Sequence, residues 1–133
     1  MGEERAPVGI ETLGQVSVNV KQLPRAVAFY RDALELPLIL DTPGMAFFDC
    51  GGTRLMLSVP TGAEFDHPGS VLYFAVRDIE AAHAALVAKG VAFRRGPHCI
   101  ARLGERDIYM AFFTDPEGNT LALMSEVDSP APY

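Results

Sequence analysis

Residues 15–20 alternate strictly between polar and apolar side chains, which is the period of a β-strand with one buried face. A second apolar segment of strand type, residues 71–76, begins 56 positions later. In the first segment one face must meet a covering layer, and the other is left for a different purpose. The apolar face consists of Val16, Val18 and Val20, and the polar face of Gln15, Ser17 and Asn19.

Each of these strands runs into a segment with the spacing of an amphipathic helix. Pro24 suits the opening turn of the first helix. In the second, Asp78 is placed to cap the N-terminus, and Gly90 stands where a left-handed C-terminal residue is expected. The predicted apolar stripes consist of Leu23, Val27, Tyr30 and Leu34 in the first helix and of Ile79, Ala82 and Leu86 in the second.

The tetrapeptide Met-Ala-Phe-Phe occurs twice, at residues 45–48 and 110–113, and each copy runs into a glycine-containing turn and another strand. In the second turn Pro116 and Gly118 favour a type I reversal, and Asp49 and Asp115 are expected to serve the two turns. Because the flanking strands and helices match as well, the chain divides into two βαβββ modules. We place them at about residues 10–60 and 69–127, with a linker over 61–68 and short flexible tails at 1–9 and 128–133.

This pattern predicts a single α+β domain in which two βαβββ modules form a curved mixed sheet around one cleft. Each module covers one side of its strands with a helix. The uncovered sides are left to enclose a shared concave cavity.

Composition narrows the class of protein further. The chain has 133 residues, 49% of them hydrophobic, which is enough for one core without disulfides. Cys50 and Cys99 match no metal or redox spacing, so we expect ordinary buried thiols and a cytoplasmic, reducing location.

The first nine residues have no apolar core, and no run of 18 apolar residues occurs, so neither a signal peptide nor a membrane span is expected. The net charge of −6 argues against a nucleic-acid partner.

Several segments together resemble the vicinal oxygen chelate superfamily, which includes glyoxalase I, bleomycin-resistance proteins and extradiol dioxygenases. They are residues 15–20 followed by 26–32, then 76–79, and above all the Asp-Pro-Glu-Gly-Asn turn at 115–119. The resemblance covers about residues 13–127 and implies the two-module fold.

The resemblance also implies where a metal would bind. Metal-using members hold one divalent ion with one ligand from the first and one from the last strand of each module, and these positions fall on Gln15, Met56, Val71 and Ala122. Only Gln15 has a side chain that can ligate a hard cation. We therefore expect no metal cofactor, with one divalent metal ion held by Gln15 and water as the alternative.

Candidate ligand-binding residues lie on the faces that point away from the helices. Arg54 shares the face of Met56 and offers a cation to a carboxylate or phosphate, or else forms a strand-edge salt bridge. Tyr73 is placed to stack on a ligand or simply to line a wall. Gln15, with Ser17 and Asn19, forms a neutral polar stripe that suits orientation of a ligand better than proton abstraction. The predicted binding set is Gln15, Asn19, Arg54, Met56, Tyr73 and Arg102.

His98 is the one candidate for acid–base catalysis, because family members carry its segment near the cavity rim. The alternative is a loop histidine bonded to backbone. His83, by contrast, lies off the helical stripe and is expected to be solvated.

The function that these observations favour is binding of a small molecule in a metal-free cleft, as in bleomycin-resistance proteins, for sequestration or resistance. The competing hypothesis is an enzyme, a glyoxalase-like lyase or isomerase acting on a small carbonyl compound, with a metal or with His98 as acid and base. Resemblance alone suggests a homodimer.

Overall fold

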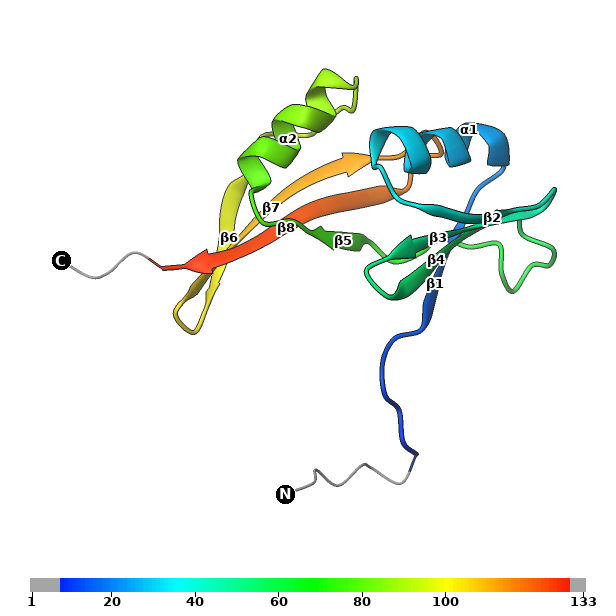
Figure 1. Cartoon of the computed structure of the whole chain (residues 1–133), viewed down its shortest axis with the longest axis horizontal. Coiled ribbons are helices and arrows are strands. Elements are labelled where there is room, and N and C mark those ends of the chain that lie inside the picture. Colours follow the sequence, from blue (N-terminus) through cyan, green and yellow to red (C-terminus); the bar gives the residue numbers. More distant parts are fainter. Residues whose placement is uncertain (1–7, 130–133) are drawn as a thin grey trace.

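The computed structural model describes residues 8–129 and contains two four-stranded mixed sheets (Figure 1). The α+β prediction of two βαβββ modules is confirmed, with one sheet in each module. Module one consists of β1 (Gln15–Asn19), α1 (Leu23–Ala28), the π-helical segment η1 (Phe29–Ala33), β2 (Leu38–Asp41), β3 (Met45–Cys50) and β4 (Thr53–Ser58). Module two consists of β5 (Leu72–Ala75), α2 (Ile79–Ala88), β6 (His98–Leu103), β7 (Arg106–Thr114) and β8 (Thr120–Asp128).

The two sheets have the same strand order, β1-β4-β3-β2 and β5-β8-β7-β6. In each, the first strand runs parallel to the last, and the other neighbours are antiparallel. The strand β8 ends at Asp128, so the predicted C-terminal tail begins one residue later. The tail positions 1–7 and 130–133 lie outside the described residues.

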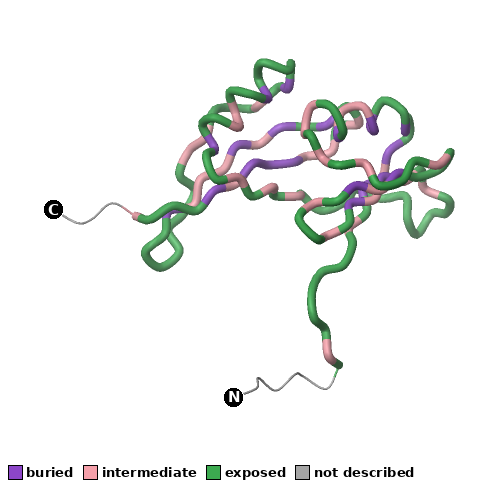
Figure 2. Tube along the Cα trace, viewed as in Figure 1, coloured by how far each residue is buried: buried purple, intermediate pink, exposed green. Residues whose placement is uncertain are grey.

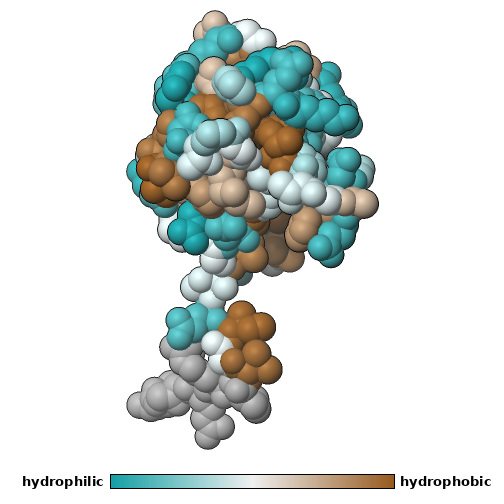
Figure 3. Space-filling model, turned by 90° about the vertical axis from the view of Figure 1, so that its right-hand side faces the viewer, coloured by the Kyte–Doolittle hydropathy of each residue, from teal (hydrophilic) through white to brown (hydrophobic). Residues whose placement is uncertain are grey.

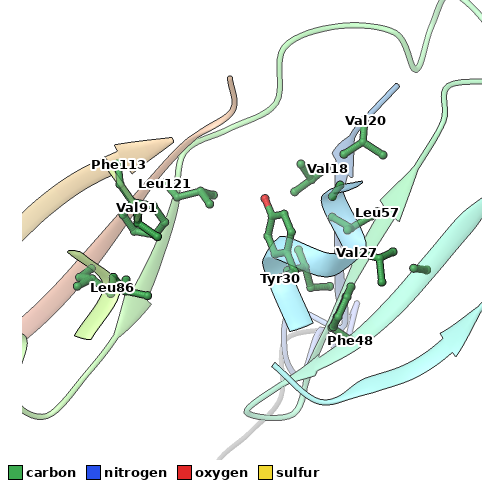
Figure 4. Close-up of a cluster of buried hydrophobic side chains, with 14 of the residues drawn as sticks. Val18, Val20, Val27, Tyr30, Phe48, Leu57, Leu86, Val91, Phe113 and Leu121 are labelled. Carbon is green, nitrogen blue, oxygen red and sulfur yellow. The ribbon is translucent and has the colours of Figure 1, made fainter. Parts of the chain in front are cut away.

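The assignment of strand faces is confirmed by burial (Figure 2). Val18 lies opposite Leu57 in the β1–β4 register, and both are buried, whereas Ser17 on the alternate side is exposed. The predicted helical stripes lie in the same core cluster or pack against it. The buried apolar residues of the two modules form one cluster (Figure 4).

The helix termini follow their local sequence in module two. The Asp78 carboxylate accepts a hydrogen bond from the Ala81 N–H at 3.1 Å, and Gly90 has φ of +89°, as predicted. In module one the helix widens after Ala28, where the Leu34 N–H donates to the Phe29 carbonyl five residues earlier. Glu35 ends it with φ of +61°.

Two expectations about single residues are wrong. His83 is not simply solvated, because its ring packs edge-to-face on Phe93 with centroids 4.5 Å apart. Cys99 is exposed and Cys50 half-buried, because Cys99 lies on the outermost strand of its sheet.

The turn at residues 115–119, between β7 and β8 of module two, is hydrogen-bonded to module one. Asp115 accepts hydrogen bonds from the backbone of Glu117 and Asn119, as expected of a turn residue, and also one from the Tyr30 hydroxyl at 2.7 Å. Asn119 Nδ2 donates to the Asn19 carbonyl at 3.2 Å. The modules are therefore fastened together on the side of the helices.

Both helices lie on the same side of the molecule, and the sheets follow one another along its long axis (Figure 1). The opposite sheet faces carry no helix. These uncovered faces hold most of the predicted binding residues. Among residues 8–129, no helix has the length and hydropathy that crossing a membrane requires.

Candidate functional site

The uncovered face of the first sheet carries a connected group around Gln15. Gln15 lies directly opposite Arg54, whose Nε donates to the Gln15 Oε1 at 2.7 Å. The Gln15 amide nitrogen lies 3.9 Å from the Met56 sulfur. The Arg54 guanidinium lies over the Phe47 ring, 5.6 Å from its centroid, in the geometry of a cation–π contact.

Next to this group the same face opens into a pocket of about 630 Å³. The pocket lies between the uncovered side of β1 and β4 and the linker that follows them. Its lining carries hydroxyl, amide, thioether, imidazole and aromatic groups, but no carboxylate, ammonium or guanidinium. The lining includes Ser17, Asn19, Met45, Met56, Ser58, Phe65 and His67.

Asn19 holds the linker against this pocket. Its Nδ2 donates to the His67 carbonyl at 2.9 Å and also to the Phe65 carbonyl. The Ser17 and Ser58 hydroxyls lie 3.3 Å apart on the pocket floor. Figure 3 shows the molecule from this end, where apolar residues reach the surface among hydrophilic ones. The polar stripe predicted on β1 thus both lines the pocket and fixes one of its walls.

The uncovered face of the second sheet is largely apolar. Tyr73, Ala122 and Phe112 lie side by side on β5, β8 and β7, and the Tyr73 and Phe112 rings meet edge-to-face with centroids 6.0 Å apart. Ala122 between them is fully buried, whereas Tyr73 is 47% exposed. Tyr73 is therefore available to a ligand or partner, and Ala122 is not.

The four positions at which the family resemblance implies a metal do not fit a divalent ion. The Gln15 amide oxygen, the one suitable donor, already accepts from the Arg54 guanidinium, which would repel a cation. Met56, Val71 and Ala122 supply no hard ligand. Among the described residues, no group of three or more His, Cys, Asp or Glu side chains is arranged to hold one.

His98 lies at the start of β6 rather than in a loop. It is opposite Met110 and so shares the uncovered face of the second sheet. Its Nδ1 lies 3.0 Å from the Arg95 Nε and 3.1 Å from the Gly96 carbonyl. This ring is half-buried and held by its neighbours.

Arg102 lies on the opposite face of the same strand. Its Nε donates to the Asp107 carboxylate at 3.0 Å, on the helix side of the sheet. Hydrogen bonds from Ser129 and from Arg102 lower the pKa of the Asp107 carboxyl. We leave Arg102 out of the proposed site, because it does not share a face with Tyr73 or His98.

The sequence analysis missed four aromatic or imidazole groups, two on the uncovered sheet faces and two in the linker wall of the pocket. Phe47 and Phe112 are the third residues of the two Met-Ala-Phe-Phe copies, and strand alternation puts them on the uncovered side, with Phe48 and Phe113 in the core. The repeat itself carried that signal. Phe65 and His67 reach the pocket through linker geometry, which the sequence pattern does not encode.

Two modules of βαβββ topology, each with a four-stranded sheet that a helix covers on one side, define the class of fold. The chain belongs to the glyoxalase/bleomycin resistance protein/dioxygenase superfamily, whose family model matches residues 12–123.

Solved structures show the same fold at low identity. A lactoylglutathione lyase from Agrobacterium tumefaciens is 21% identical over 87% of this chain and 94% of its own, with a TM-score of 0.67. A superfamily member from Sphaerobacter thermophilus is 23% identical over 87% and 98%, with a TM-score of 0.72. Another from Alicyclobacillus acidocaldarius is 17% identical over 88% and 92%, with a TM-score of 0.70. A comparison with curated protein sequences found no significant match.

Proposed function

We propose that this protein binds a small molecule, without a metal ion, in the pocket between β1, β4 and the linker. The observation that carries the proposal is the pocket itself, which is large enough for a drug-sized ligand and lined by neutral groups. Hydroxyl and amide groups orient a ligand but barely titrate, so they favour binding over proton transfer. Thioether side chains adapt to varied apolar shapes, which suits sequestration or resistance.

The proposal includes a homodimer. The apolar Tyr73–Phe112 face of the second sheet is open in one chain, although such a face is normally covered. A second copy of the chain packed against this face would cover it. A cytoplasmic location remains part of the proposal, in keeping with two unpaired thiols.

A thermal-shift screen against metabolites and drugs tests the binding function. Ligands found in the screen should bind at least several-fold more weakly to Met56→Ala and Asn19→Ala, measured by calorimetric titration. Val87→Ala, on the exposed side of α2, is the matched control and should bind normally. Unchanged affinity in both pocket variants would move the site elsewhere.

Metal content separates this proposal from metal-dependent lyase or isomerase activity. We expect elemental analysis after mild purification to find far less than one divalent ion per chain. The reason is the donor set, in which one amide oxygen is already bonded to a guanidinium. A stoichiometric ion that is lost on Gln15→Ala would restore the enzyme hypothesis.

Acid–base catalysis by His98 is the second candidate function, favoured by its place on the uncovered face. It predicts metal-free turnover of a small carbonyl compound that disappears in His98→Ala. If ligands bind but are recovered unchanged, the binding function stands alone.

A further inference from the structure

Arg54 has unused hydrogen-bonding capacity on an open face. Its Nε is bonded to Gln15, and its guanidinium is supported by the Phe47 ring. Among residues 8–129, neither terminal nitrogen of Arg54 has a hydrogen-bond or ion-pair partner. The side chain is therefore held in place while two of its nitrogens remain free. An arginine fixed in this way loses less conformational freedom on meeting an anion.

The space beside Arg54 is apolar. Gln15, Arg54, Phe47, Ile39 and Leu40 line a pocket of about 300 Å³. Ile39 is 57% exposed and Leu40 is 50% exposed. A cation thus lies at one end of a short apolar wall, which is the pattern that an amphipathic anion requires.

The carboxylate on the neighbouring strand forms no ion pair with this cation. Asp49 lies opposite Arg54 in the β3–β4 register, yet its Oδ1 accepts from the Gly52 N–H at 3.2 Å in the adjoining turn. No ion pair joins it to Arg54 in the described part of the chain. Since the whole protein carries a net charge of −6, long-range attraction does not bring anions here, and recognition must be local.

We propose that Arg54 binds the carboxylate of a small amphipathic carboxylic acid, whose apolar chain lies along Phe47, Ile39 and Leu40. This inference goes beyond the proposed binding function, because it names a second ligand site, beside the pocket of β1, β4 and the linker, on the same sheet face. Two terminal N–H groups of one guanidinium match the two oxygens of a carboxylate. A phosphate is a less suitable ligand, because it carries more negative charge than a single arginine beside Asp49 can neutralise.

Octanoate is a suitable probe for calorimetric titration. Arg54→Ala should weaken octanoate binding about 10- to 100-fold, the range for a hydrogen bond to a charged group. Asp49→Asn should strengthen it, because the amide keeps the turn contact and removes the like charge. Arg77→Ala, which removes an exposed positive charge in module two, is the matched control and should bind octanoate normally.

Three comparisons test the ligand class. Octanamide should bind at least tenfold more weakly than octanoate, and affinity should rise about two- to fourfold per CH₂ from butyrate to octanoate. Inorganic phosphate should bind more weakly than octanoate. Equal binding of octanamide or phosphate, or no binding of octanoate at millimolar concentration, would overturn the inference.

Failure of this inference leaves the binding function testable by itself. A neutral ligand that depends on Met56 and Asn19, together with no binding of octanoate at millimolar concentration, would support the binding function and refute this inference. Loss of octanoate binding in Arg54→Ala, with no effect of Met56→Ala on the binding of any ligand, would support this inference and refute the proposed binding function.

Discussion

A single buried hydrogen bond from Tyr30 joins residues that are 85 positions apart in the chain. The Tyr30 ring packs against Phe48 in module one (Figure 4). Its hydroxyl donates a hydrogen bond to the Asp115 carboxylate of module two. Burial, and then the negative charge and hydrogen bond of Asp115, raise the pKa of the Tyr30 hydroxyl far above its ordinary value. Tyr30 therefore stays protonated in the folded protein well into alkaline solution.

Tyr30→Phe should lower the free energy of unfolding by about 1–3 kcal/mol at pH 7, because Asp115 loses a buried donor. The contribution of Tyr30 to the free energy of unfolding should also depend on pH, and the pKa shift gives the direction. The unfolded tyrosine ionises near pH 10 while the folded one does not, so the wild type should lose stability as pH rises through about 10. Denaturant melts at pH 7 and 10.5 measure this.

The Phe variant should lose less stability over that range than the wild type. Val87→Ala, on the exposed side of α2, is the control and should lose as much stability between the two pH values as the wild type does. Identical alkaline slopes for Tyr30→Phe and the wild type would contradict the assignment.

At the level of elements, the two helices acquire their N-terminal caps in different ways. Asp78 caps α2 from the adjoining position, which is why the sequence predicted it. The first helix has no side-chain cap of its own. Its Lys21 and Gln22 N–H groups donate to the Glu117 carboxylate at 2.9 Å each. A cap from 95 residues away leaves no local signal in the sequence.

Glu117→Gln should destabilise the protein by about 1–2 kcal/mol at pH 7. Burial raises the pKa of Glu117, but hydrogen bonds from Gln22, Lys21 and Arg25 outweigh it, and the net pKa is lowered. Stability from this carboxylate is therefore present above about pH 4.3, the unfolded value, and is lost as pH falls further. Urea melts from pH 7 to 3 should show the stabilities of the wild type and Glu117→Gln converging. Glu64→Gln, in the exposed linker, is the matched control and should have the wild-type urea midpoint at pH 7.

For the whole molecule, the repeat and the alternation of residues predicted the module order, both hairpins and the faces of β1, β4, β5 and β8, since these depend on local periodicity. Features set by register or by distant contacts were not predictable. A bulge between Cys99 and Ala101 reverses the alternation of β6, so Arg102 lies on the other face from His98. Strand order likewise decides that Tyr73 and Phe112 meet over Ala122.

The two modules should unfold in one cooperative transition, although each has its own sheet and helix. Their buried apolar residues form one cluster, and the Tyr30–Asp115 and Glu117–α1 hydrogen bonds tie them together across it. Neither module can therefore lose its packing without exposing apolar surface of the other. Since the chain has no tryptophan, tyrosine fluorescence and far-ultraviolet circular dichroism are the suitable probes. At fixed protein concentration the two probes should give one midpoint, and the calorimetric and van't Hoff enthalpies should agree. Two resolved transitions would show that the modules fold independently and that the turn at 115–119 serves only its own hairpin.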